Sequence, residues 1–459
     1  GGVVQIFTRG GTQGFSPFAA VTLGSNSYRE LSAGLSGGQD NVRYALGVSH
    51  TDDKGFSSTN PTVPFGNYNP DRDAFKQKAF NASVDWQLNS DWKLSAGAVY
   101  ADGTNHFDDG PGVDTKSDAR TTVLRAGVEG RITPDWTTRL NYNQGTDRSN
   151  ALVSASPWNI PGLFETQQDQ WTWQNDVKTP IGTVVAGAET LLQKVNSSTA
   201  YTVTERRINA VFAGLSGTAS GHSWQLNARR DDNSQFGGSS TGYAGYGYQF
   251  NPNWRAHAGY GTSFVAPSFN QLYWPGFGNA LLEPEEGKNL EFGVDWTQGN
   301  HHVKLIRFDN KIRGFITSGK APVNLPRARI EGWTLGYDGT FDALTLRAAV
   351  DALDPRNELT GKLLPRRSKS QVTLGADYSV GPWNFGGSLL KVGRRYDDAA
   401  NAKPLASYTT VDLQASYAFA RDWNVQAKLN NVGDREYETA QGYNQPGRQF
   451  FVTLRYTPK

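Results

Sequence analysis

The sequence has no cysteine and no methionine among its 459 residues. Because cysteine is absent, the protein has neither a disulfide framework nor a cysteine-based metal site. Methionine is absent even from position 1, so we expect a processed or truncated product. The formal net charge is only +2, and this near-neutral balance argues against a nucleic-acid partner.

Long hydrophobic runs are also missing. No segment approaches the roughly 18 apolar residues of a transmembrane helix. Hydrophobic residues make up 37% of the chain, which is enough to cover one face of many strands but too little for several large soluble cores. The composition is uniform from end to end, so the chain does not divide into soluble domains joined by linkers.

The chain does contain many segments in which apolar and polar residues alternate. In residues 83–88, Val84, Trp86 and Leu88 fall on one face, and the polar residues between them fall on the other. The same alternation recurs in residues 92–100, 124–132, 136–143 and 450–456. The apolar face is rich in aromatic residues, and the opposite face carries charges. A period of two indicates β-strands, so the pattern predicts an all-β protein.

Tryptophan recurs directly after short polar turns, as in "NSDW", "TPDW", "NPNW" and "ARDW". Indole has an apolar body and one N–H donor, and it therefore prefers the level of lipid headgroups. Short turns also alternate with long polar segments, such as residues 102–119 and 150–170. Both features are typical of bacterial outer-membrane barrels, which have short periplasmic turns and long extracellular loops.

We therefore predict a transmembrane antiparallel β-barrel of about 22 strands, with its apolar face toward lipid and its charged face around a wet lumen. Barrels of this size are plugged transporters rather than open porins. The alternative is a large secreted sandwich or propeller, although a propeller should show a blade repeat and none is visible. In the barrel, Leu94, Val128 and Leu454 should not lie in a dry protein interior.

Several motifs resemble those of the TonB-dependent outer-membrane receptors. The segment "GTSFVAPSFNQLYWPGFGNALLEPEEGKNLEFGVDW" (residues 261–296) resembles the signature of that family. Its later strands are similar to "ARIEGW" (328–333) and "NNVGDREYETAQGYNQPGRQFFVTLRY" (430–456). Within the family, "GSNSY", "RRDDNSQFG" and "LLPRRSKSQ" are most similar to the cobalamin receptors. The resemblance implies that long outer loops capture a ligand and that the inner-membrane TonB complex then rearranges a plug.

The resemblance also divides the chain. "GGVVQIFTR" (residues 1–9) resembles the last strand of the family's plug domain. We therefore expect residues 1–10 to be the C-terminal remnant of a plug and residues 11–459 to be the receptor barrel. The rest of the plug, with the short box that recruits TonB, would lie outside this chain, and energised transport would require the full-length protein.

A calcium site is implied by the same resemblance, because in cobalamin receptors calcium held on aspartates orders two outer loops. The matching residues are Asp71, Asp73, Asp108 and Asp114, and Asp109 is an extra carboxylate in the second loop. Another family ligand falls near residues 52–56, where Asp53 is the candidate residue. Calcium takes six to eight oxygen ligands, and it would neutralise aspartates that otherwise repel each other. The alternative is that these loops are simply solvated, since aspartate favours turns on its own account.

For the transported ligand, the resemblance implies cobalamin, with Phe107 and Asp108 in contact with it. Arg366, in "LLPRRSK", matches an arginine of the inner barrel wall that reaches the ligand in the family. The alternative for Arg366 is an ordinary lumen-lining charge paired to the plug. Residues 150–170 and 270–279 are rich in Trp, Tyr, Phe and Asn, which suits a large amphipathic ligand.

Three functions remain open from the sequence. The leading one is an active outer-membrane importer of cobalamin or a related corrinoid; the others are a ferric-siderophore or haem receptor and a passive porin. An enzyme is not expected, because the six histidines form no HExxH or Ser-His-Asp spacing. We expect the protein to be a monomer embedded in outer-membrane lipid and to bind the TonB complex through the plug. Phages or bacteriocins are further expected partners.

Overall fold

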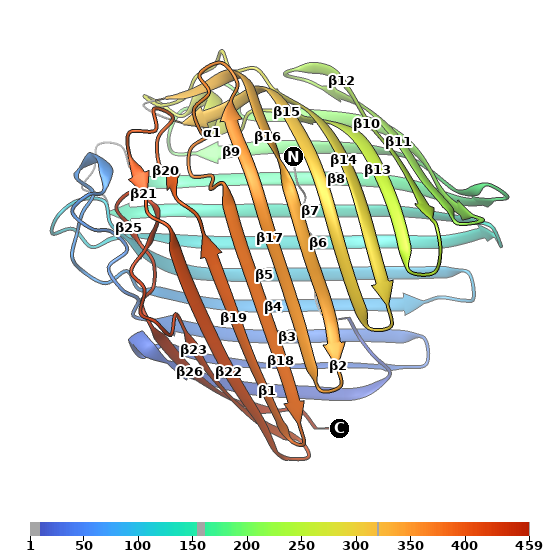
Figure 1. Ribbon diagram of the computed structural model, residues 1–459, viewed down its shortest axis with the longest axis horizontal. Helices are drawn as coiled ribbons and strands as arrows, with labels where there is room; N and C mark the ends of the chain where they lie inside the picture. The colour runs from blue at the N-terminus through green and yellow to red at the C-terminus, as the bar shows by residue number, and fades with distance from the viewer. Residues whose placement is uncertain (1–9, 154–160, 319–320, 459) are drawn as a thin grey trace.

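The computed structural model describes residues 10–153, 161–318 and 321–458. Its main element is a 22-stranded antiparallel sheet that closes on itself where β1 (Gly14–Gly24) pairs with β26 (Gln449–Tyr456) (Figure 1). The other strands of this sheet pair with their neighbours in sequence order. The sheet is therefore an up-and-down barrel, and the prediction of an all-β barrel of about 22 strands is confirmed.

The remaining strands of the wall are long for a β protein. They are β2 (Arg29–Gln39), β3 (Val42–Asp53), β4 (Phe75–Gln87), β5 (Trp92–Phe107), β6 (Thr115–Thr133), β7 (Trp136–Val153), β8 (Gly162–Thr179), β9 (Gly182–Ser197), β10 (Glu205–Ala219), β11 (His222–Asn233), β12 (Gly237–Gln249), β13 (Trp254–Val265), β14 (Glu285–Gln298), β15 (His301–Ser318), β16 (Pro322–Phe341), β17 (Leu344–Asn357), β18 (Ser370–Val380), β19 (Trp383–Val392), β22 (Tyr408–Ala420) and β23 (Trp423–Asn430). No helix among the described residues has the length and apolar character needed to cross a membrane.

The connections gather at the two ends of the barrel, long ones at one end and short turns at the other (Figure 1). The end with the long connections, which we call the long-loop end, also carries the small elements of the protein. They are α1 (Phe269–Tyr273), the 3-10 turns η1 (Ser25–Ser27) and η2 (Pro64–Gly66), and two hairpins formed by β20 (Arg395–Tyr396) with β21 (Pro404–Leu405) and by β24 (Glu438–Ala440) with β25 (Tyr443–Asn444). The predicted asymmetry between short turns and long loops is confirmed.

Strand register separates the two faces of the wall. The apolar face carries Trp86, Leu94, Val128 and Leu140, which lie directly opposite one another on β4 to β7. Residues directly opposite in an antiparallel pair point to the same side of the sheet. The charged face is shifted by one residue. There the carboxylate of Glu129 binds Lys93 at 3.5 Å and Arg139 at 2.6 Å.

The apolar face is not packed into a protein core. Leu94 is 36% exposed and Leu454 is 40% exposed, while Val128 is half-buried between its neighbours on the sheet. The hydrophobic cluster of buried residues among those described contains only Phe315, Ala328 and Leu364. A soluble sandwich would bury one face of each sheet, so the structure favours the barrel over that alternative.

The tryptophans mark the short-turn end of the wall. Five strands, β5, β7, β13, β19 and β23, begin with a tryptophan there, and all five indoles are exposed. At the turn before β5, the side-chain oxygen of Asn89 accepts hydrogen bonds from the backbone N–H groups of Asp91 and Trp92, at 2.9 and 3.0 Å. Asn251 binds the chain before Trp254 in the same way. The polar residue closes the turn, and the indole follows at the first strand position.

This geometry predicts the effect of replacing the turn asparagine. Asn89→Ala removes two hydrogen bonds from one hairpin, and we expect it to lower the free energy of unfolding by about 1–2 kcal/mol. Urea titration of the barrel in lipid vesicles, followed by tryptophan fluorescence, measures this change. Ser90→Ala is the matched control, because the Ser90 hydroxyl donates only to the exposed Asp91 carboxylate. Equal stability of the two variants would contradict the proposed role of Asn89.

The predicted loop lengths are wrong. The polar segment 102–119 was expected to be a loop, yet β5 continues to Phe107 and β6 begins at Thr115. The segment 150–170 likewise contains the end of β7 and the start of β8, and residues 154–160 between them lie outside the described residues. These strands continue past the apolar band, where both faces are polar and the sequence loses its apolar period. Of the predicted plug remnant, residues 1–10, only Gly10 is described.

Candidate metal and ligand site

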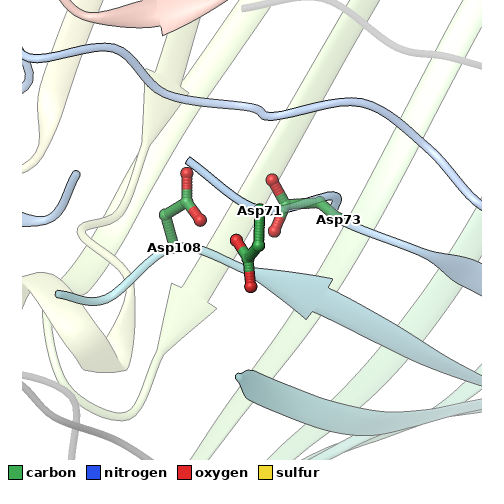
Figure 2. Close-up of side chains that lie close together, drawn as sticks. All are labelled: Asp71, Asp73 and Asp108. Atoms are coloured by element: carbon green, nitrogen blue, oxygen red, sulfur yellow. The ribbon is translucent and has the colours of Figure 1, made fainter. Parts of the chain in front are cut away.

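Three of the predicted carboxylates come together at the long-loop end. Asp71 and Asp73 lie in the connection between β3 and β4, and Asp108 follows β5 directly. One ligand oxygen from each lies within 4.8 Å of the other two, and the three side chains form a compact group (Figure 2). They meet because β3 to β6 are neighbours in the sheet, which places their connections at this end side by side.

Backbone contacts hold Asp73 in this position. The backbone N–H of Asp73 donates to the carbonyl of Phe56 at 3.0 Å, and its carboxylate accepts from the N–H of Ser58 at 2.8 Å. Gly55 makes the approach possible, because a Cβ there would lie 1.8 Å from the carbonyl oxygen of Asp73 and its φ is +63°. The two halves of this connection are thus fastened to each other beside the carboxylates.

Asp108 has the most constrained environment of the three. The residue is only 9% exposed, and one carboxylate oxygen accepts a hydrogen bond from the hydroxyl of Thr59. Burial raises the pKa of Asp108 to about 6; the nearby carboxylates of Asp73 and Asp71 add to the rise, and the Thr59 hydrogen bond opposes it. Each effect has the sign expected for a carboxylate that is desolvated next to like charges.

The donor set fits a hard divalent cation. Among the described residues, one oxygen of Asp71 and one of Asp108 are shielded from solvent without a hydrogen-bond partner. Buried carboxylate oxygens are costly unless they are paired or coordinate a metal. Calcium binds six to eight oxygens from carboxylates, carbonyls and water, so these three residues would supply part of its shell. The sequence did not predict the contribution of Thr59, because a single threonine in a loop carries no periodic or motif signal.

The other predicted metal ligands lie elsewhere. Asp109 is buried beside Asp108, but it is not among the three carboxylates that converge. Asp114 binds the Nδ1 of His106 at 2.6 Å, and its side chain is 62% exposed. Asp53, the last residue of β3, accepts from the backbone N–H of Gly55 at 2.9 Å. The structure thus brings together Asp71, Asp73 and Asp108 only.

The family match had implied that Arg366 lies on the inner wall of the barrel. In the structure it lies in a long connection and not on a strand. It lies between β17 and β18 with a φ of +59°. Its Nε donates to the carboxylate of Asp397 at 2.7 Å, and the same carboxylate oxygen accepts from the backbone N–H of Gln441 at 3.2 Å. Arg366 therefore links three long connections. Its side chain remains 55% exposed and can reach a ligand above the barrel.

Aromatic rings from separate loops also meet at this end. Phe164 and Trp274 fall in the two segments predicted to be aromatic loops, and their ring centroids lie 6.2 Å apart. Tyr201 lies 5.9 Å from Phe164 and 6.3 Å from Trp274, and burial raises its pKa to about 12. Phe107, the last residue of β5, is half-buried immediately before Asp108. The long-loop end thus combines acidic, basic and aromatic groups suited to binding a large amphipathic molecule.

The comparisons with known proteins agree with this architecture. The family model described as TonB dependent receptor-like, beta-barrel, matches residues 147–432. A vitamin B12 transporter of Photobacterium profundum is 29% identical over 477 residues, which cover 99% of this chain and 76% of that protein.

Solved structures of siderophore receptors have the same fold. A mutant ferric enterobactin receptor of Pseudomonas aeruginosa matches 98% of this chain and 81% of its own, with a TM-score of 0.83 and 15% identity. The siderophore receptor of Acinetobacter baumannii matches the same shares with a TM-score of 0.84 and 14% identity. At such identities these structures show the fold alone.

The family model and the similarity along 99% of this chain place the protein in the bacterial outer membrane. The apolar face of the wall therefore meets lipid, the charged face lines the lumen, and the long connections are extracellular. Proteins of this family are receptors and transporters, which agrees with the absence of a catalytic motif from the sequence. The chain belongs to the TonB-dependent receptor β-barrel family of outer-membrane proteins.

Proposed function

We propose that the protein imports cobalamin or a closely related corrinoid across the outer membrane, energised by the TonB complex through a plug domain. The observation that carries this proposal is the convergence of Asp71, Asp73 and Asp108 on two adjacent extracellular connections. These are the loops whose aspartates match calcium ligands of the cobalamin receptors. The similarity to a vitamin B12 transporter along nearly the whole chain supports the same conclusion.

In this proposal each group has a separate task. Calcium, when bound, supplies the positive charge that neutralises the three carboxylates and holds the two connections together. Phe107 offers an apolar surface next to Asp108, and Arg366 presents a guanidinium held in place by Asp397. These groups capture and orient a ligand at the mouth of the barrel. Transport requires no bond to be made or broken in the ligand.

Calorimetry on the full-length receptor in detergent tests the identity of the ligand. Cyanocobalamin and ferric enterobactin are titrated separately, each with millimolar calcium and again after the protein has been freed of calcium. We expect cyanocobalamin to bind, with an affinity between about 5-fold and 150-fold higher in calcium, which is the usual range of coupling between two sites. Ferric enterobactin should show no binding in either condition.

The opposite pattern would overturn the proposal. Binding of ferric enterobactin without binding of cyanocobalamin would identify a siderophore receptor, as in the solved structures of similar fold. Cobalamin binding that does not change with calcium would leave the ligand assignment intact but remove the metal from the mechanism.

A further inference from the structure

A row of charges crosses the lipid-facing side of the wall just beyond its apolar band. On β4 and β5 the band ends at the pair Phe80 and Tyr100, and the next pair on the same face is Lys78 and Asp102. From Trp92 to Tyr100 the strand advances about 27 Å, at about 3.4 Å per residue. At a strand tilt of about 35–45° this spans about 19–22 Å of membrane depth, most of an apolar band of about 25 Å. The charges therefore lie where lipid headgroups replace hydrocarbon.

The row runs across five strands in direct register. It consists of His50, Lys78, Asp102, Arg120 and Arg148, each lying opposite the next on β3 to β7, and we call it the basic row. Neighbouring strands lie about 4.8 Å apart, so the five side chains form one continuous line on the surface. The row lies toward the long connections and therefore faces the outer leaflet.

A hollow in the wall coincides with the basic row. All five of its residues line the hollow, together with Lys76 and Asp118 from the next position along β4 and β6. The hollow is therefore lined by four permanent cations and two carboxylates. A concave surface with an excess of positive charge, next to hydrocarbon, is suited to an anionic headgroup.

The carboxylates do not satisfy all of the cations. Asp102 binds Arg120 at 3.1 Å, and Asp118 accepts from the hydroxyl of Thr104 at 2.8 Å. Within the part of the chain that the structure describes, Lys78 and Arg148 have neither an ion pair nor a side-chain hydrogen bond. Arg148 lies directly opposite Arg120, and like charges in that position destabilise a sheet unless an anion joins them. Glu165, opposite Arg148 on β8, forms no ion pair with it in the described structure.

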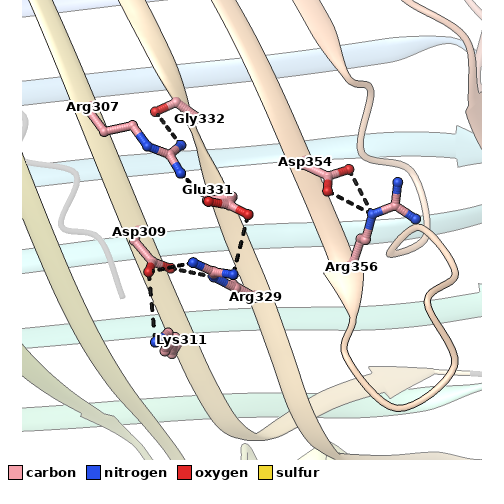
Figure 3. Close-up of polar contacts among 8 residues, drawn as sticks. All are labelled: Arg307, Asp309, Lys311, Arg329, Glu331, Gly332, Asp354 and Arg356. Atoms are coloured by element: carbon pink, nitrogen blue, oxygen red, sulfur yellow. Dashed lines mark hydrogen bonds and ion pairs between the residues drawn. The ribbon is translucent and has the colours of Figure 1, made fainter.

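The opposite wall of the barrel provides a contrast at the same end. On β15 to β17, the carboxylate of Asp309 binds Arg329 at 2.7 Å, Glu331 binds Arg307, and Asp354 binds Arg356 at 2.7 Å (Figure 3). Each of these arginines has a carboxylate partner on its own or a neighbouring strand. Ion pairs therefore do form at this end of the wall where a carboxylate lies within reach. Lys78 and Arg148 have no such partner in the described structure, and the same holds for Lys288 and Arg327 on β14 and β16.

We propose that the basic row binds the phosphate of a phosphorylated lipid headgroup in the outer leaflet, with the acyl chains of that lipid lying on the apolar face below. Lys78 and Arg148 supply the two free cations, and Arg120 is shared between Asp102 and the phosphate. The phosphate would bridge the like charges of Arg120 and Arg148 on adjacent strands. The bound lipid would lie below the extracellular connections that carry Asp71, Asp73 and Asp108.

Native mass spectrometry of the detergent-solubilised receptor, titrated with diphosphorylated lipid A, tests this proposal. Each cation near a membrane surface contributes about 1 kcal/mol to the binding of an anionic lipid. Lys78→Gln/Arg148→Gln should therefore weaken lipid A binding about 30-fold. The matched control is Lys311→Gln/Arg313→Gln on the opposite wall. Lys311 already binds Asp309 at 3.8 Å and Arg313 binds Glu286 at 3.6 Å, so losing these two cations should leave the affinity unchanged. Arg148→Lys with native Lys78 should retain most of the binding, because the charge is kept.

Two further arms separate the possible ligands. Inorganic phosphate at the same concentration should not displace lipid A, because the acyl chains contribute to binding; displacement would assign the hollow to a free phosphate instead. Removal of both phosphates from the lipid should weaken its binding to the level of the double variant. Equal affinities of the native receptor and Lys78→Gln/Arg148→Gln, with both folded as judged by heat-modifiable gel mobility, would overturn the proposal.

Discussion

Replacing Asp71 and Asp108 together with asparagine is expected to lower calcium affinity by about 100-fold or more. Changing groups that merely orient metal ligands already costs 10-fold to 100-fold in affinity, so removing two ligands should cost at least the upper value. Asparagine keeps the shape of each side chain but removes the charge that attracts the ion. Calcium titration of the purified receptor by calorimetry measures the loss, and the same variant should lose the calcium enhancement of cobalamin binding.

Asp114→Asn is the control for this experiment. Asp114 lies in the same connection as Asp108, but it binds His106 outside the three-carboxylate group. Its calcium affinity should stay within about twofold of the native value, since surface ion pairs contribute little. Full calcium binding by the Asp71/Asp108 variant would show that the cluster is not the metal site. Loss of binding by Asp114→Asn instead would restore the broader set of ligands predicted from the sequence.

The fold could be predicted from the sequence because one physical rule acts at every strand. Each strand separates lipid from water, so residues such as Leu94 and Glu129 must alternate, and the period of two appears wherever the wall crosses the apolar band. The tryptophans were predictable for the same reason, because Trp92 and Trp254 follow turns closed by Asn89 and Asn251. A local signal is sufficient here, since the membrane imposes the same environment on each hairpin.

The site was less predictable because it depends on contacts between distant loops. Aspartates could be assigned to the two connections from the family resemblance, but only the structure separates Asp71, Asp73 and Asp108 from Asp114. The placement of Arg366 by Asp397 joins residues 31 positions apart, and no pattern in the sequence encodes that pair. The basic row was missed for a related reason. Its members stand singly on five strands, and only the register places them opposite one another.

Calcium binding is also expected to weaken about tenfold between pH 7 and pH 5. A calcium ligand must be deprotonated, and Asp108 has a pKa of about 6, so protons compete with the ion across this interval. The carboxylate is about nine-tenths ionised one unit above its pKa and about one-tenth ionised one unit below it, which gives the tenfold ratio. Calorimetric calcium titrations at pH 5, 6 and 7 measure the effect.

Acidification should weaken calcium binding but should stabilise the calcium-free loops. An aspartate in the unfolded chain has a pKa of about 3.9, whereas folded Asp108 titrates at about 6. Between these values the folded state binds more protons, so acidification from pH 7 toward pH 4 stabilises the ion-free fold at this site, and the stabilisation is lost as the pH rises through 6. Hydrogen exchange of the amides near Ser58 and Asp73 reports on it, because these residues hold the loop.

Asp108→Asn distinguishes this mechanism from a general effect of acid on the barrel. The variant has no titrating carboxyl at position 108, so the protection of these amides should become nearly independent of pH, and its weaker calcium binding should fall less steeply between pH 7 and pH 5. Native calcium affinity that stays constant over the same interval would mean that Asp108 is already ionised at pH 5 or does not bind the ion. Opposite pH trends with and without calcium, both removed by one substitution, would assign proton and ion to the same oxygen atoms.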